Sequence, residues 1–403
     1  MKLLVISQYY SPDITAAAFR IKESVDGLRD MGVKIHILTS TPHKSSQRID
    51  QKEDVTSNIW RVNVPVFSKP SRINYIIQYL TFCFRSIIVA LRIRKDFDYD
   101  IIFATSPPIT IAFTAFFVRF LTKKPLIVDI RDIWPDSAVA VGKLRKDSII
   151  FKILKSFELF IYKKADGITC VAKPMSEYIR QLSERNDICL VYNGVDKGSK
   201  NREVIRNTQY RNNEFIMCYA GNLGFAQGIS EILNAFIIFN EKFVENNFRL
   251  NLIGEGPEKQ VTESLVKSHN LENKITFFGS LSKKETITYL NNSDVLLIPL
   301  IKSEAFKYTI PSKVFDYLQV GKPIISTIQG EGREILELSE ANILTDLDED
   351  SLSISFKTMY EKYDYFNSHC NRNIELSNRF SREKSNQILL RYIKSITHTE
   401  SKH

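Results

Sequence analysis

The sequence predicts an α/β protein with two doubly wound parallel sheets, and two observations support this prediction. Strand-like apolar runs alternate with helical patterns through most of the chain, which is the order from which parallel sheets are built. The chain also has 403 residues, more than a single hydrophobic core usually organises. We therefore expect two domains, each binding ligands at the carboxyl ends of its strands.

The first alternating series runs from the N-terminus to about residue 196. Strands are predicted at 2–7, 33–39, 59–66, 101–104, 126–130, 167–171 and 188–192. Helices are predicted at 16–31, 73–94, 109–121, 151–164 and 174–182. Three loops should share the carboxyl edge of this sheet, at 8–15, 105–108 and 131–136.

The third of these loops belongs to DIRDIWPDS, residues 129–137, and carries the densest chemistry of the first half. Asp132 is placed to accept a proton or to orient a substrate hydroxyl. Trp134 is either a wall for a sugar ring or a core residue. Asp129 is either chemical or a strand-end residue that pairs with Arg131.

Two apolar stretches of the first half raise the question of a membrane. Residues 73–91 contain one charge, Arg85, and residues 101–121 contain one, Arg119. Prolines interrupt the second stretch and polar residues the first, so buried helices are favoured over membrane spans. The aromatic residues and flanking cations of 72–95 are also typical of a surface that rests on anionic lipid.

A polar run at 197–213 is the best linker candidate, and a second alternating series follows it. Strands are predicted at 215–220, 248–253, 275–278, 295–299 and from 324, and helices at 229–243, 257–269 and 283–291. The tail from 352 to 396 should be helical.

Several turns of this second half have the composition of a phosphate site. Gly221 opens a turn with two more glycines, and Gly254-Glu255-Gly256 forms another, so that backbone amides can approach a phosphate closely. Glu331 lies between two glycines. A tight structural turn explains each glycine pattern equally well on its own.

The stretch 304–323 is predicted to leave a polar loop and enter a short helix. Ser312 should cap the helix and Gly321 should end it in a left-handed conformation. Lys313 at the positive end of the helix suits a phosphate, and Asp316 one turn later suits sugar hydroxyls. A solvent-facing cap with a Lys–Asp pair is the alternative.

Taken together, these motifs resemble the retaining GT-B glycosyltransferases of glycosyltransferase family 4, especially the bacterial surface-polysaccharide branch that includes fucosamine transferases. The matching segments are YYSPD at 9–13, TSPP at 105–108, DIRDIWPDS at 129–137, VYNGVD at 191–196, YAGNLGFAQG at 219–228, LIGEGPE at 252–258, PSKVFDYLQVGKPII at 311–325 and FSRE at 380–383. They follow the family's order along almost the whole chain.

The resemblance implies a GT-B fold in which two Rossmann-like domains face each other across a cleft. An acceptor-binding domain would span 1–196, a linker 197–213 and a nucleotide-sugar domain 214–376. A last helix at 377–403 would return to the N-terminal domain. Catalysis would retain the anomeric configuration and use no metal and no cofactor. The six histidines show no metal-ligand spacing, which agrees with that expectation.

The resemblance also assigns roles to residues. Catalytic roles fall to Asp132 and Lys313. The acceptor side would include Tyr10, Ser106, Arg131 and Trp134. Donor binding would involve Gly221, Asn222, Gly224, Gln227, Gly254, Gly256, Glu304, Lys307, Pro311, Ser312, Lys313, Asp316 and Glu331.

Two departures from the family pattern matter. Asn222 and Gln227 stand where many members have cations, so Lys313, helped by Lys307, should supply charge to the diphosphate. Tyr308 stands where the first of two paired acids is usual. Glu304 is the nearest acid, four residues early. A donor with an altered hydroxyl pattern, such as a 6-deoxy-N-acetyl sugar, would explain that change.

The expected activity is transfer of a sugar from a UDP-N-acetylated hexosamine or 6-deoxyhexosamine, such as fucosamine, to a polyprenyl-diphosphate-linked saccharide of O-antigen or capsule. The enzyme would be peripheral at the inner face of the cytoplasmic membrane. The net charge of +9 fits anionic substrates or lipid, and no nucleic-acid motif accompanies it. The scattered cysteines and the lack of a signal sequence agree with a cytoplasmic location. A sugar-nucleotide 2-epimerase and a catalytically silent binding subunit remain as alternatives.

Overall fold

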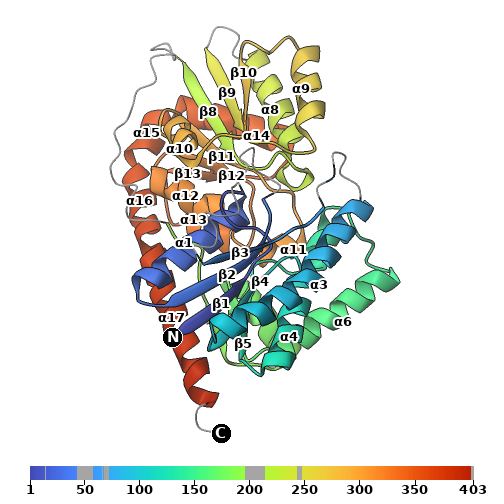
Figure 1. Ribbon diagram of the computed structural model, residues 1–403. Coiled ribbons are helices and arrows are strands. Elements are labelled where there is room, and N and C mark those ends of the chain that lie inside the picture. Colours follow the sequence, from blue (N-terminus) through green and yellow to red (C-terminus); the bar gives the residue numbers. More distant parts are fainter. Residues whose placement is uncertain are drawn as a thin grey trace. The chain divides into compact units, whose positions relative to one another are not determined.

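The computed structural model describes residues 1–13, 15–42, 58–65, 67, 72–195, 214–242 and 247–400. The predicted linker at 197–213 lies outside these residues. The chain forms two compact units. Unit 1 is Met1–Asn193 together with the segment that starts at Arg382, and unit 2 is Gly194–Ser381. Both contain a parallel sheet with helices on its faces (Figure 1).

Unit 1 contains a seven-stranded parallel sheet in the order β3-β2-β1-β4-β5-β6-β7. Its strands are β1 (Lys2–Ile6), β2 (Lys34–Ser40), β3 (Ile59–Val62), β4 (Ile101–Ser106), β5 (Leu126–Ile130), β6 (Gly167–Cys170) and β7 (Ile188–Leu190). Its helices up to the last strand are α1 (Ala16–Asp30), α3 (Arg72–Asp96), α4 (Thr110–Thr122), α5 (Asp136–Ala140), α6 (Ile149–Lys164) and α7 (Lys173–Ser183). Every residue of β4 and β5 is buried, because helices cover both faces of a parallel sheet.

The strand order of unit 1 reverses at β1, which lies between β2 and β4. Ligands of open α/β sheets bind at such a reversal, outside the carboxyl ends of the strands. Since β1, β4 and β5 are neighbours, the three predicted loops at 8–15, 105–108 and 131–136 follow adjacent strand ends.

Unit 2 contains a six-stranded parallel sheet in the order β10-β9-β8-β11-β12-β13. Its strands are β8 (Phe215–Ala220), β9 (Phe248–Ile253), β10 (Ile275–Gly279), β11 (Val295–Ile298), β12 (Ile324–Ser326) and β13 (Asn342–Leu344). Its helical segments are η2 (Phe225–Gln227), α8 (Ile229–Lys242), α9 (Lys259–Ser268), α10 (Lys283–Asn291), α11 (Glu304–Lys307), α12 (Ser312–Val320), α13 (Glu331–Glu337), α14 (Glu349–Glu361), α15 (Tyr363–Ser368) and α16 (Cys370–Arg379). The short helices α11 and α13 were not expected from the sequence, which predicts a polar loop at 304–311.

The last helix, α17 (Arg382–Glu400), belongs to unit 1, which confirms the predicted return of the chain to the N-terminal domain. It packs beside α1. Leu389 and Ile393 join the same buried cluster as Ile21 and Val25 of α1. Arg382 forms an ion pair with Glu23 of α1, with Nη2 and Oε2 2.6 Å apart.

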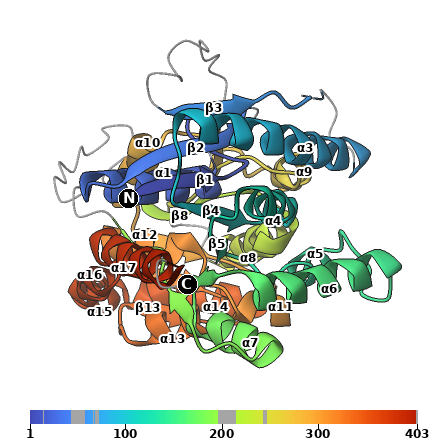
Figure 2. The same cartoon turned by 60° about the horizontal axis from the view of Figure 1, so that its bottom comes forward.

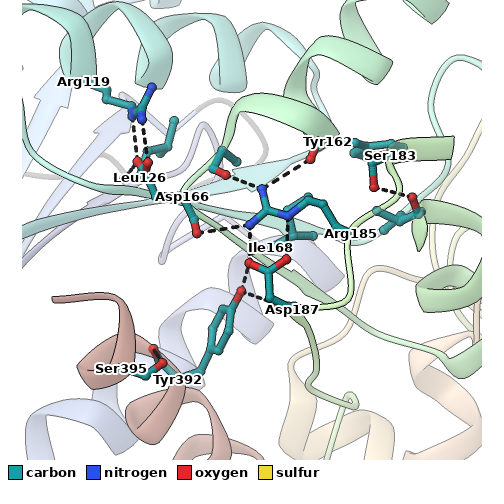
Figure 3. A network of polar contacts seen from close by, with 12 residues as sticks. Arg119, Leu126, Tyr162, Asp166, Ile168, Ser183, Arg185, Asp187, Tyr392 and Ser395 are labelled. Carbon is teal, nitrogen blue, oxygen red and sulfur yellow. Dashed lines mark hydrogen bonds and ion pairs between the residues drawn. The ribbon is translucent and has the colours of Figure 1, made fainter. Parts of the chain in front are cut away.

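A polar network ties the middle of α17 to the amino-end loops of the unit 1 sheet (Figure 3). The Tyr392 hydroxyl donates to the carbonyl of Asp187 (2.7 Å) and accepts from the amide of Ile168 (2.9 Å). Asp187 pairs with Arg185, and Arg185 donates to the Asp166 carbonyl (3.2 Å). Asp166 binds Arg119 at the end of α4 through two hydrogen bonds of 2.6 and 2.5 Å. The network therefore holds four segments that are distant in sequence.

Candidate functional site

The glycines in the three glycine-containing turns of unit 2 are required for different structural reasons. The amide of Gly221 donates to Ile253 (2.9 Å), and that of Leu223 to Glu255 (2.9 Å), so the turns after β8 and β9 lie against each other. A Cβ atom on Gly254 would stand 1.8 Å from the Gly221 carbonyl oxygen, and one on Gly256 2.1 Å from that of Leu223. Turn-to-turn packing therefore requires Gly254 and Gly256, and their contact with a donor stays a prediction.

The turn after β8 leaves polar groups available at its outer side. Among the described residues, the amides of Asn222 and Gly224 donate no hydrogen bond. The exposed Asn222 side chain reaches Gln227, with Nδ2 and Oε1 3.5 Å apart. Gly224 lies beneath this pair, because a Cβ there would be 2.4 Å from Asn222 Nδ2. Unpaired backbone amides at a strand-to-helix turn suit an anion.

Helix α12 is joined to this turn by two side chains of its inner face. The Tyr317 hydroxyl accepts from the amide of Ala220 (2.8 Å). Lys313 reaches the next residue, since a Cβ on Gly221 would meet Lys313 Nζ at 2.7 Å. The structure thus brings the predicted glycine turn and the predicted lysine together.

Lys313 is a desolvated cation. Its Nζ lies 4.0 Å from the centroid of the Tyr219 ring. Within the described part of the chain, no carboxylate stands within ion-pair distance of it. Burial lowers the pKa of the Lys313 ammonium to about 7, against the smaller opposite effect of Asp316. A partly buried cation without a counterion is destabilised, and an anionic ligand would relieve this.

The start of α12 differs in detail from the prediction. Pro311, not Ser312, is the N-cap, and its extended backbone (φ −54°, ψ 132°) carries no side-chain cap hydrogen bond. Ser312 is the first helical residue and is exposed, as is Asp316 one turn on. The opposite face, with Val314 and Leu318, is fully buried, as the sequence predicts. Gly321 ends the helix at φ 68°.

The remaining predicted donor residues form a second group. The exposed side chains of Glu304 and Lys307 pair with each other, with Oε1 and Nζ 2.6 Å apart. A Cβ on Gly330 would be 2.4 Å from the Lys307 carbonyl, so the turn before the buried Glu331 packs on α11. Lys307 therefore already has an acidic partner, which makes it a weaker candidate than Lys313 for a diphosphate.

In unit 1 the acid at the end of β5 is structural. Asp129 is buried and pairs with Arg20 of α1, 3.4 Å from Oδ1 to Nη2, and not with Arg131 as the sequence suggested. Asp129 Oδ1 also accepts from the Thr169 hydroxyl (2.7 Å). Arg20 further contacts the side chain of Asn193.

Sequence reasoning did not find Arg20 or Gln8. Arg20 lies 109 residues from Asp129, and no local pattern joins them. Gln8 lies two residues after the end of β1 and is fully buried, yet neither polar atom of its side-chain amide has a partner within the described residues. Its position in the predicted loop at 8–15, at the carboxyl edge of the sheet, is the sequence signal that could have identified it.

Arg131 and Asp132 follow Asp129 in the chain and are more exposed to solvent than it is. Burial and the neighbouring charge of Arg20 lower the pKa of Arg131 to about 9, while Asp129 opposes the shift. Burial raises the pKa of Asp132 to about 6, against hydrogen bonds with Ser137 and Ile133 and the charge of Arg131. A carboxyl with a pKa near neutrality is suited to exchange a proton.

The other predicted acceptor residues are less exposed. Ser106 is buried at the end of β4, and its carbonyl accepts from the amide of Arg131 (3.0 Å). Trp134 is half-buried in the loop that follows β5. Tyr10 is 3% exposed and belongs to the core cluster of Ile21 and Val25. Burial raises the pKa of Tyr10 to about 12. The structure therefore gives Tyr10 a packing role, and a role in acceptor binding stays a prediction.

Within the described ranges, no three histidine, cysteine or carboxylate side chains are placed so that they could hold a metal ion together. The cysteines there are all free.

Two family models match this chain one after the other. Residues 17–198 match Glycosyltransferase Family 4, and residues 200–367 match Glycosyl transferases group 1. The chain belongs to the family 4 glycosyltransferases. As a member of that family it carries a GT-B fold, with one parallel-sheet domain for each of the two matches.

Curated relatives agree with this membership. The chain is 25% identical over 247 residues to the probable glycosyltransferase WbjE of Pseudomonas aeruginosa, a match that covers 59% of each chain. It is 20% identical to the putative colanic acid biosynthesis glycosyl transferase WcaI of Escherichia coli, over 82% of this chain and 84% of WcaI. Both names describe glycosyltransferases, and the name of WcaI adds colanic acid biosynthesis.

Solved structures share the fold. Sucrose-phosphate synthase from Thermosynechococcus elongatus superposes with a TM-score of 0.81 at 13% identity, over 99% of this chain and 100% of that one. HepE from Anabaena, solved in complex with UDP and glucose, gives 0.74 at 15% identity, over 98% and 100% of the two chains.

Proposed function

We propose that this family 4 glycosyltransferase moves a sugar from a UDP-sugar, an N-acetylated hexosamine or 6-deoxyhexosamine, to a polyprenyl-diphosphate-linked saccharide of a surface polysaccharide. It would do so with retention of configuration and without a metal, at the inner face of the cytoplasmic membrane. The complexes of HepE with UDP and UDP-glucose support the donor class. The name of WcaI, a putative colanic acid biosynthesis glycosyl transferase, supports the polysaccharide class.

The observation that carries the proposal is the position of Lys313. Its ammonium lies at Gly221, beside a turn with unused amides, and Asp316 is the one acid of the described residues whose charge acts on it noticeably. When the bond from the anomeric carbon to the diphosphate breaks, negative charge develops on the leaving oxygen. A cation held without a counterion stabilises that charge more than it stabilises the intact donor.

The other residues take the following roles. Asp316, exposed on the outer face of α12, would accept hydrogen bonds from the ribose hydroxyls. The acceptor hydroxyl would attack the face that the diphosphate leaves, and its proton would pass to the departing phosphate oxygen. Asp132 in unit 1 would orient the acceptor hydroxyl. Arg131 would bind the acceptor's phosphate groups, for which guanidinium groups are suited.

Binding and transfer test this proposal together. UDP should raise the melting temperature of the wild type, GDP should raise it less, and Lys313→Met should make the UDP effect much smaller. Transfer from a UDP-sugar to a polyprenyl-linked saccharide should then follow. A protein stabilised by neither nucleotide would refute the donor site. Donor conversion without acceptor would indicate an epimerase, and binding without any turnover a silent subunit.

A further inference from the structure

The exposed large hydrophobic side chains of this protein are concentrated on three helices of unit 1. Thirteen of the twenty found among the described residues lie on α3, α4 and α6. Phe120 on α4 is 79% exposed, and Ile149 on α6 is 76% exposed. The others are scattered over several elements. Single exposed apolar residues are ordinary, but a concentration of this kind marks an interaction surface.

Two of these helices have an inverted pattern. On α4, Ala112 and Ala115 face inward, while Phe113 and Phe117 are 45% exposed. On α3, the buried face includes Gln78 and Ser86, while Leu80, Phe84 and Ile88 face outward. A helix on the surface of a globular protein normally places its apolar face on the core and its polar face in water. The outer sides of α3 and α4 therefore fit a medium less polar than water.

The three helices form one continuous face. Helix α3 packs along α4. Helix α4 contacts α6 through Phe113 and Phe157, with ring centroids 6.1 Å apart, and through Phe116 and Phe160, 5.0 Å apart. Figure 2 shows α4 between α3 and α6. We call the outer side of α3, α4 and α6 the three-helix face.

Cations outnumber acids around this face, although exposed Asp96, Asp98 and Asp147 lie near them. The three helices contain two acids, Asp96 and Glu158, and Glu158 is buried in a pair with Lys155 (2.6 Å). Exposed cations stand at the helix ends and in the segment before α6. They are Arg92, Lys95, Lys143, Arg145, Lys146, Lys163 and Lys164. Apolar side chains bordered by cations match the acyl boundary and headgroups of an anionic bilayer.

We propose that the three-helix face docks on the surface of an anionic lipid bilayer, with α3, α4 and α6 lying in the interface. Helix α3 is long and apolar enough to cross a membrane by length and composition. However, Phe82, Ala90 and Ile93 on its other side are buried in unit 1, so it lies on the sheet. A second copy of the chain fits less well, because a symmetric contact would bring cations against cations.

The inner side of α6 connects this face to the proposed acceptor loop. Lys155 pairs with Asp136, with Nζ and Oδ2 2.6 Å apart. Asp136 begins α5, directly after the loop that carries Asp132 and Trp134. A docked α6 would therefore hold that loop close to the lipid surface. This deepens the proposed function, on which it rests, because a polyprenyl-linked acceptor resides in the membrane.

Vesicle flotation without nucleotide tests the proposal. Wild-type protein should float with vesicles of phosphatidylglycerol and phosphatidylethanolamine, and several-fold less with phosphatidylcholine alone. The triple variant Phe84→Gln, Phe120→Gln, Ile153→Gln should lower the bound fraction at least tenfold. A matched control replaces exposed apolar residues of unit 2 (Val261→Gln, Leu338→Gln, Ile354→Gln) and should float like the wild type. The double variant Lys143→Glu, Lys163→Glu should bind anionic vesicles more weakly than the wild type and should bind phosphatidylcholine vesicles equally.

The outcomes separate the two proposals. A circular dichroism spectrum and a urea unfolding midpoint equal to those of the wild type show that unit 1 of the triple variant is folded. Undiminished flotation of the triple variant would overturn the docking face. The docking face would also be overturned if the wild type did not float, formed a dimer in solution, and lost that dimer through the triple substitution. The face would then join two copies of the chain. Flotation with no UDP binding would leave the docking face intact and refute the donor site.

Discussion

Each unit holds a cation in a desolvated position, and the two cations are treated differently. In unit 1, Arg20 is surrounded by acceptors, namely Asp129, the Asn193 side chain and the carbonyl of Val191. In unit 2, Lys313 has an aromatic ring and the Gly221 turn as neighbours, with no ion-pair partner among the described residues. Burial lowers the pKa of both groups.

The difference indicates where function lies. A buried charge with a full set of partners contributes to the native structure, and removal of a partner is costly. A partly buried charge without a counterion costs stability, and such a cost is typical of functional sites. Arg20 therefore belongs to the framework of unit 1. Lys313 has the properties of a binding group.

The largest expected effect comes from the paired cation. Asp129→Ala would leave Arg20 buried without its counterion, and we expect a loss of about 3–5 kcal/mol in the free energy of unfolding. Urea unfolding followed by circular dichroism measures it. The control Asp98→Ala removes an exposed acid whose ion pairs are screened by solvent, so the free energy of unfolding should change little. Equal losses in the two variants would remove the basis of the comparison.

Replacement of the unpaired cation, Lys313, should lower activity and raise stability. Lys313→Met should lower kcat/KM for transfer about 100-fold, the usual cost of losing a group that stabilises transition-state charge. The same change removes a desolvated charge, so the melting temperature without ligand should rise, by about 2–4 °C if about 1 kcal/mol is recovered. Lys307→Met, at an exposed ion pair, should change both quantities little. A Lys313→Met protein that lost both activity and stability would indicate a structural lysine.

The pH dependence of UDP binding sharpens the assignment. The pKa of Lys313 in the free protein is about 7, so the ammonium is charged below that pH and neutral above it. A bound diphosphate favours the charged form. Between about pH 7.5 and 9, where the phosphates are fully ionised, the Kd for UDP should rise by up to tenfold per pH unit. Calorimetric titration measures this, and Lys313→Met should give a Kd that does not vary with pH. A flat wild-type profile would exclude Lys313 as the titrating group.

The sequence predicted the elements better than their contacts. Alternating strands and helices and the two faces of α12 follow from periodicity, which is local, and Val314 and Leu318 are buried as expected. The partner of Asp129 depends on how α1 packs on the sheet, so local reasoning offered Arg131, two residues away, as one alternative and did not consider Arg20. Gly254 and Gly256 were assigned to a phosphate because nothing local shows that their turn touches another. The approach of Lys313 to Gly221 joins residues 92 apart, and only the family resemblance suggested it.

The smallest expected effect concerns the polar network that anchors α17, where every charge has a partner (Figure 3). Tyr392→Phe removes a hydroxyl that bridges Ile168 and Asp187. We expect a loss of about 1 kcal/mol in stability, since one amide and one carbonyl each lose a partner. UDP affinity should not change, because the network belongs to unit 1 and the proposed donor site to unit 2. Denaturant unfolding and calorimetry on the same variant measure both quantities. A change in UDP affinity comparable to that of Lys313→Met would show that framework and binding charges are not separate in this protein.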